Sequence, residues 1–294
     1  MYNTVAELLR ISVERGVRFW EIVLENEIKL TEKNEAEIFL LLDERYEIMR
    51  RSAKGALTYS HKTVGRLIEG IAGNQYSYAE NTGGISGRFI NTLMAYALSC
   101  SEVNASMGLI CAAPTAGACG ILPAVLISLE ERDHVKRRTI LEALLSASGI
   151  GAIVMHNATV SGAEGGCQAE CGVAGAIAAA AAVQIAGGPD ETAINAFCIA
   201  LMNVMGLVCD PVAGLVQVPC AQRNASQAVN AIISADMALS GIASIIPADE
   251  MIEAMHRVGM MLPLQLKETS EGGMAATPAA KAIKNHIFKQ TYLN

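Results

Sequence analysis

The chain has 294 residues, of which 52% are hydrophobic and 17% charged, so it contains ample apolar material for a core and does not resemble a disordered protein. Its net charge of −7, with no basic face to offset it, argues against binding of nucleic acid. Aromatic residues make up only 4%, while alanine and glycine are abundant, which favours close helix–helix packing over a β-sheet. We therefore predict an all-α protein with a single large helical domain over residues 1–294.

The sequence predicts a cytoplasmic protein. The N-terminus lacks a basic segment followed by an apolar run, so no signal peptide is expected. The most hydrophobic window, residues 172–188, is rich in alanine and glycine, contains Gln184 and is short for a spanning helix. It is expected to be a buried helix and not a membrane segment. Eight cysteines in a long chain without a secretory signal are typical of reduced thiols in the cytoplasm.

The first part of the chain is charged and amphipathic. Residues 4–52 place apolar side chains at helical spacing, and residues 35–50 are typical of a long surface helix. Residues 1–52 are expected either to dock a partner subunit or to form an ordinary packing layer. Residues 73–87 combine several glycines with Asn, Ser and Thr and are predicted to form a long loop. Arg88 follows it and is expected either to orient an anionic substrate or to be solvated at a helix start.

Helices are predicted for most of the remaining chain. Between a helix at residues 89–106 and an apolar run at residues 124–129 lies a Gly-rich turn at residues 112–123. Such a turn at a helix N-terminus presents free N–H groups, which suit a carboxylate. Thr115 in this turn is expected either to cap the helix or to bind substrate. Further helices are predicted at residues 139–156, 171–187, 190–208, 223–240 and 247–261, followed by a polar segment at residues 267–274.

The eight cysteines fall into three groups by their surroundings. Those in apolar helical contexts are expected to fill the core: Cys100, Cys111 and Cys198. Those that neighbour a candidate site are ambiguous: Cys119 and Cys171. Those at Gly- or Pro-containing bends, where backbone N–H groups can approach sulfur, are Cys167, Cys209 and Cys220. Spacing alone leaves two interpretations of this last group open, a three-thiolate metal site and buried or redox-active thiols.

Several familiar motifs are absent from the sequence. It contains no phosphate-binding P-loop, no dinucleotide-binding glycine pattern and no nucleophile elbow of a serine hydrolase. Paired Cys-x-x-Cys knuckles for zinc are also absent. Nucleotide, zinc-finger and serine-hydrolase functions are therefore not predicted.

Four ordered blocks resemble the iron–sulfur-dependent bacterial L-serine dehydratases (L-serine deaminases), and more narrowly the α subunit of their two-subunit form. The blocks are APTAGACGILP at residues 113–123, SGAEGGCQ at 161–168, CDPVAGLVQVPC at 209–220 and ETSEGG at 268–273. The resemblance covers roughly residues 49–275. It implies an all-helical catalytic domain with a [4Fe–4S] cluster and without pyridoxal phosphate. By their motifs, the implied cluster ligands are Cys167, Cys209 and Cys220.

The resemblance implies an L-serine ammonia-lyase that forms pyruvate and ammonia. With three thiolate ligands, one iron stays open to act as a Lewis acid on the serine hydroxyl while a base removes the α-proton. Two alternatives remain at this point. One is a lyase of the L-cysteine desulfidase type, and the other is a non-catalytic, cluster-based redox sensor or scaffold subunit.

The remaining candidate residues are expected to bind substrate or to transfer protons. Expected substrate-binding residues are Thr115, Ala116, Gly117, Asn157, Ser161, Gly162, Thr269 and Ser270. Expected catalytic residues are Thr115, Asn157, Ser161 and Glu164. The carboxylates of Glu164 and Glu170 are expected to be acid–base groups or structural helix-end residues.

The sequence departs from the family's pattern in three places. Single-chain relatives carry a further N-terminal domain that contributes to the site, so a separate β subunit is implied, and the general base lies on that subunit or on this chain. Some relatives end in a cysteine that can occupy the open iron, whereas residues 291–294 contain none, so no such capping is expected. Lys267 and Glu271 stand where relatives often carry arginines.

Overall fold

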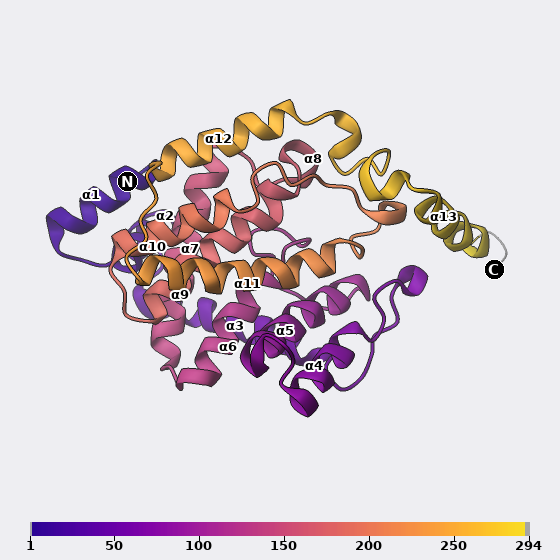
Figure 1. The fold of residues 1–294 in the computed structure, drawn as a ribbon. Coiled ribbons are helices and arrows are strands. Elements are labelled where there is room, and N and C mark those ends of the chain that lie inside the picture. Colours follow the sequence, from indigo (N-terminus) through magenta and orange to yellow (C-terminus); the bar gives the residue numbers. More distant parts are fainter. Residues whose placement is uncertain (1, 292–294) are drawn as a thin grey trace.

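The computed structural model of the protein describes residues 2–291, which fold into α-helices joined by turns and short 3-10 segments (Figure 1). Within these residues there is no β-strand, and the only extended pairing is an isolated bridge between Cys209 and Lys267. The predicted all-α fold is thus confirmed. Residues 292–294, at the C-terminus where no iron-binding cysteine is expected, lie outside the described part. The helices are α1 (Val5–Arg15), α2 (Phe19–Thr31), α3 (Glu35–Gly55), α4 (Ile71–Thr82), α5 (Gly87–Ala105), α6 (Ile121–Asp133), α7 (Arg137–Asn157), α8 (Gly162–Gly165), α9 (Val173–Ile185), α10 (Asp190–Met202), α11 (Cys220–Leu239), α12 (Ala248–Met261) and α13 (Pro278–Thr291).

Helix α9 is the central helix of the fold. It packs against α6, α7, α10 and α11, which surround it (Figure 1). Every residue of α9 except Gln184 is buried. Because its alanine and glycine side chains are small, the neighbouring helices can approach its backbone closely. A π-helical turn, η2 (Gln168–Gly172), leads into α9, so the predicted Ala-rich helix begins with an irregular turn next to the candidate site.

Two helices have the length and hydropathy of membrane spans, but most of their surface is packed inside the protein. In α7, 67% of the most apolar window is buried, and in residues 168–185 the buried share is 89%. A buried core helix passes the same test of length and hydropathy, so these two helices are weak evidence for a membrane span.

Asp190, at the start of α10, fixes the N-terminal helices to the core. Its carboxylate accepts hydrogen bonds from the Ser12 hydroxyl at 2.8 Å and from the Phe19 backbone N–H at 3.0 Å. It also pairs with the Arg18 guanidinium at 3.1 Å. These bonds offset the cost of burying a charge, because Asp190 is only 6% exposed. Helices α1 and α2 therefore form part of the packed domain, and a docking role for residues 1–52 stays a prediction.

Glu131, near the end of α6, ties this helix to α3 and α5. The Tyr96 hydroxyl of α5 donates a hydrogen bond to its carboxylate at 2.6 Å, and Lys54 of α3 forms an ion pair with it. Partial burial favours the neutral carboxyl, but the two donors outweigh it, so the pKa of Glu131 is lowered. The ionised form of Glu131 therefore stabilises the contact among the three helices.

The structure corrects three expectations about secondary structure. Most of the loop predicted at residues 73–87 belongs to α4 (Ile71–Thr82), where Gly73 allows close packing because a Cβ on it would lie 3.1 Å from the Leu57 carbonyl oxygen. The helix predicted to reach residue 208 ends at Met202. Helix α13 was not predicted, and it lies at the edge of the molecule, away from the central helices (Figure 1).

Candidate metal centre and active site

Four buried cysteines from three segments of the chain lie near the N-terminal ends of α9 and α11. Cys167 directly precedes η2 and Cys171 lies within it. Cys209 follows α10 in the isolated bridge described above. Cys220 is the first residue of α11. Their exposed fractions are between 1% and 7%, so the four thiols are shielded from solvent.

The four thiols are close enough to act on one another electrostatically. Burial raises the pKa of Cys220 to about 12, and the charge of Cys167 adds to this shift. The pKa of Cys209 is raised first by burial and then by the charge of Cys167. The ligand atoms of Cys167, Glu170 and Cys171 all lie within 4.8 Å of one another. The fold therefore brings together the three cysteines singled out in the sequence, and this thiol-rich set is compatible with a metal cofactor.

Cys167 and Cys171 have opposite tendencies to ionise. The pKa of Cys167 is lowered because the Cys171 thiol hydrogen-bonds to its sulfur and Arg223 supplies a positive charge nearby, which together outweigh burial. The same hydrogen bond, with burial, raises the pKa of Cys171 well above its ordinary value. Cys167 is therefore the more acidic thiol of this pair, and Cys171 is the one that donates to it.

A buried ion pair holds the Cys209 bend against α11. The Arg223 guanidinium of α11 donates a hydrogen bond to the Asp210 carboxylate at 2.8 Å, and the two side chains are 13% and 4% exposed. The second carboxylate oxygen of Asp210 accepts a hydrogen bond from the Met274 backbone N–H at 2.7 Å. The ion pair thus connects α11, the Cys209 bend and the segment that contains residues 267–274.

Asn224 of α11 joins this helix to the Gly-rich turn. Its side-chain nitrogen donates to the Gly117 carbonyl at 2.7 Å and to the Cys220 carbonyl at 2.9 Å. Its side-chain oxygen accepts from the Gly120 backbone N–H at 2.9 Å. The Asn224 side chain is fully buried, so these bonds replace the water that it lacks. A Cβ on Gly120 would overlap the Ala97 carbonyl oxygen, which explains the glycine at this point of the turn.

Glu170 of η2 contacts the same Gly-rich turn at Thr115 and Gly117. The Thr115 hydroxyl donates a hydrogen bond to Glu170 Oε1 at 2.6 Å, and a Cβ on Gly117 would lie only 2.5 Å from that oxygen. Burial raises the pKa of Glu170, the Thr115 hydrogen bond opposes the rise, and the nearby charge of Glu268 adds to it. Thr115 also accepts a hydrogen bond from the Ala118 N–H at 3.3 Å, so it both closes the turn and orients Glu170.

Of the other predicted residues, Gly162 lies beside the Cys209 sulfur and Ser270 bonds to the Cys209 bend. A Cβ on Gly162 would lie 3.2 Å from Cys209 Sγ and 3.2 Å from Glu170 Oε2, so its Cα faces both groups. Ser161 precedes it, and the Ser161 O accepts the hydrogen bonds that open the short helix α8. The Ser270 hydroxyl donates to a backbone carbonyl of the Cys209 bend at 2.8 Å, at Pro211.

The other predicted residues have partners outside this group. The Asn157 side chain donates a hydrogen bond to the Asn3 carbonyl at 2.7 Å, and the Glu164 carboxylate accepts one from the Thr159 hydroxyl at 2.5 Å. The Thr269 hydroxyl donates to the Leu264 carbonyl at 3.2 Å, and the Ala116 carbonyl accepts from the Asn104 side-chain amide at 3.1 Å. Arg88 forms an exposed ion pair with Glu80, as a solvated arginine at a helix start would. The roles expected for these residues stay predictions.

Sequence reasoning did not single out Arg223 and Glu268. A signal for Arg223 was available, because it follows Cys220 by three residues and so shares its helix face. Cys100 and Cys198 are buried in helices as expected. Cys111 was wrongly placed in a helix, since it is half-buried in the irregular chain between α5 and α6.

Comparison with known proteins places the chain in a family. Residues 14–275 match the family described as "Serine dehydratase alpha chain". The chain is 47% identical to the "L-serine dehydratase, alpha chain" of Peptoniphilus asaccharolyticus over 290 residues, which cover 99% of each chain. It is 42% identical to the "Probable L-serine dehydratase, alpha chain" of Bacillus subtilis over 98% of this chain and 96% of that one. An L-serine dehydratase of Escherichia coli is 36% identical over 93% of this chain, and the match covers 61% of that longer relative. With its buried thiols held between η2, the Cys209 bend and α11, the chain belongs to the serine dehydratase alpha chain family.

Proposed function

We propose that this chain is the [4Fe–4S]-binding subunit of an L-serine ammonia-lyase, which converts L-serine to pyruvate and ammonia. The observation that carries the proposal is the convergence of four buried thiols with a guanidinium and two carboxylates in a chain of this family. Thiolates are soft ligands that select iron–sulfur clusters or zinc over magnesium and calcium. The names of the relatives favour serine over cysteine as the substrate.

The residues present fit a cluster with three protein ligands. Cys167, Cys209 and Cys220 would hold it, and Cys171 would remain a thiol that donates to the Cys167 sulfur. Burial raises the pKa of Cys209 and that of Cys220, so a bound cation is what would keep both ionised. When bound, such a cluster supplies an iron that acts as a Lewis acid on the serine hydroxyl.

We propose that the Gly-rich turn binds the substrate carboxylate. The backbone N–H groups of Ala116 and Gly117 make no hydrogen bond to any other residue in the described structure, so both are available as donors. The turn leads into α6, whose N-terminus adds a partial positive charge. Gly162 leaves space beside the Cys209 sulfur because it has no side chain. Ser161 is proposed to contact the same substrate from this side.

Glu170 is the proposed acceptor of the α-proton. Thr115 fixes one of its oxygens through the 2.6 Å hydrogen bond, and burial raises its pKa, which makes the carboxylate a stronger base than a solvated one. The elimination breaks the Cα–H and Cβ–O bonds of serine, and the hydroxyl takes up a proton and leaves as water. The aminoacrylate that remains hydrolyses to pyruvate and ammonia. Asn157 and Glu164 are proposed as further catalytic residues, and Asn157, Thr269 and Ser270 as further substrate-binding residues.

A separate β chain is proposed to complete the enzyme. This chain aligns with nearly the whole of the two alpha chains but with only 61% of the longer Escherichia coli relative. The remainder of that relative would correspond to a second subunit here. We place the assembly in the cytoplasm, where the thiols stay reduced.

Anaerobic purification of this chain with its β chain tests the proposal. We expect about four irons and four sulfides per chain, and faster pyruvate formation from L-serine than from L-cysteine. Cys209→Ser should lose iron, sulfide and activity together, whereas Cys198→Ser, at a buried cysteine of α10 away from the site, should retain all three. Zinc in place of iron and sulfide, or an unchanged iron content in Cys209→Ser, would contradict the proposal.

A further inference from the structure

A cavity lies beside the Gly-rich turn, between α3 and α7. Its volume is about 320 Å³, and the turn residues 111–114 form part of its wall. The remaining wall is mainly apolar, with Leu42 and Met49 from α3, Leu144 from α7 and Ile177 from α9. A cavity of this size is at the lower end of the range for sites that bind small molecules.

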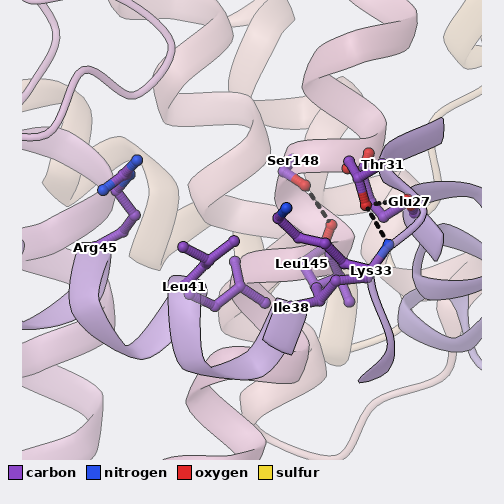
Figure 2. A pocket seen from close by; sticks show the side chains of 9 residues that line it. Glu27, Thr31, Lys33, Ile38, Leu41, Arg45, Leu145 and Ser148 are labelled. Carbon is purple, nitrogen blue, oxygen red and sulfur yellow. Dashed lines mark hydrogen bonds between the residues drawn. The ribbon is translucent and has the colours of Figure 1, made fainter. Parts of the chain in front are cut away.

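Arg45, a solvent-exposed residue of α3, is the only charged residue that lines this cavity. Every other arginine of the chain forms a hydrogen bond or an ion pair within residues 2–291, whereas Arg45 forms neither with any described residue. Arg45 also lines the adjoining pocket of about 220 Å³, where it stands apart from Glu27 and Lys33 at the opposite end (Figure 2). The Ser148 hydroxyl, shared by both cavities, donates to its own helix at Leu145.

The lining defines the chemistry of the ligand. Apolar walls suit an aliphatic chain, and an unpaired guanidinium suits a carboxylate, which it can bind through two parallel hydrogen bonds. The 320 Å³ cavity has no carboxylate that could receive an ammonium group. We propose that this cavity binds a small aliphatic carboxylate of about six to eight carbons, with its carboxylate on Arg45 and its chain against the α3–α7 wall. An amino acid of the same length should bind less well, because its ammonium group would lack a partner.

The cavity wall is connected to the candidate metal centre through the Gly-rich turn. Pro114, in the cavity wall, directly precedes Thr115, which holds Glu170. The cavity also contains Cys111, the only cysteine of the chain that is not buried in the described structure. Cys111 can therefore serve as a chemical reporter of occupancy that is independent of enzymatic activity.

Calorimetric titration of the full chain with octanoate, octylamine and 2-aminooctanoate tests the proposal, with maleimide labelling of Cys111 to locate the site. We expect saturable binding of octanoate, a slower labelling of Cys111 when octanoate is bound, and at least about tenfold weaker binding of the other two compounds. Arg45→Gln should weaken octanoate binding about tenfold or more. Arg51→Gln is the matched control, an exposed arginine on the same helix that binds only a backbone carbonyl.

A second variant separates loss of the ligand from loss of the fold. Ala152→Leu adds volume at an exposed position of the cavity wall, so it should block octanoate while the far-UV circular dichroism stays unchanged. Equal binding of octanoate and octylamine, unchanged affinity in Arg45→Gln, or no saturable binding up to about ten millimolar would each overturn the proposal.

Discussion

The contribution of Asn224 to stability can be worked out from its contacts. Replacement by alanine removes three hydrogen bonds of 2.7–2.9 Å from a fully buried position. The Gly117 carbonyl and the Gly120 N–H then lose a partner, and each unsatisfied buried group costs about 1–3 kcal/mol. We therefore expect Asn224→Ala to lower the free energy of unfolding by about 3 kcal/mol, a large share of the 5–15 kcal/mol typical of a domain.

Urea denaturation of the metal-free chain, followed by far-UV circular dichroism, measures this loss. Ser234→Ala is the control, because Ser234 is fully buried on the same helix but donates only one hydrogen bond, to Asn230 at 3.3 Å. Its expected cost is about 1 kcal/mol or less. A loss below about 1 kcal/mol in Asn224→Ala, or a loss no larger than that of the control, would refute the reasoning.

Three other changes test separate parts of the structure. Gly117→Ala should lower kcat/KM for pyruvate formation about a hundredfold, because the new Cβ would displace Glu170; unchanged kinetics would argue against the role of this contact. Asp210→Asn should cost about 3 kcal/mol in urea denaturation, because it removes the carboxylate that pairs with the largely buried Arg223; Asp210→Asn stability within about 1 kcal/mol of the parent would show that this ion pair contributes little. Glu131→Gln should cost up to about 1 kcal/mol at pH 7. Since the folded-state pKa of Glu131 is lowered, its contribution is fully present above the unfolded pKa of about 4.3 and is lost as the pH falls through the folded-state pKa; a gap that did not shrink as the pH was lowered would contradict this.

Helix positions were largely readable from the sequence, because they depend on local pattern. The Ala-rich helix α9 was predicted from composition, and the later helices were predicted to within a few residues at most ends. Helix α4 was missed because its glycines and polar residues are typical of loops. Its helical state depends instead on tertiary packing, because α4 packs against α5 and Gly73 permits a close approach to the Leu57 carbonyl that no local pattern reveals.

The candidate site was only partly predictable for a related reason. Bends rich in glycine or proline marked Cys167, Cys209 and Cys220, and the fold brings them together. The sequence could not show that Cys171 donates to Cys167 or that Arg223 faces it, because both depend on how η2 and α11 meet. The partners of Asn157 and Thr269 likewise come from loops whose positions only the folded chain defines.

The order of the cysteines along the chain has a consequence for maturation. Between Cys167 and Cys209 the chain forms α9 and α10, the central helix and its direct neighbour. The packing of these two helices therefore brings the sulfur atoms together, and it does so in the folded chain itself. Binding of the proposed cluster to the folded chain would then stabilise that chain by mass action. Loss of the proposed cluster in air should therefore leave a folded chain that can bind it again.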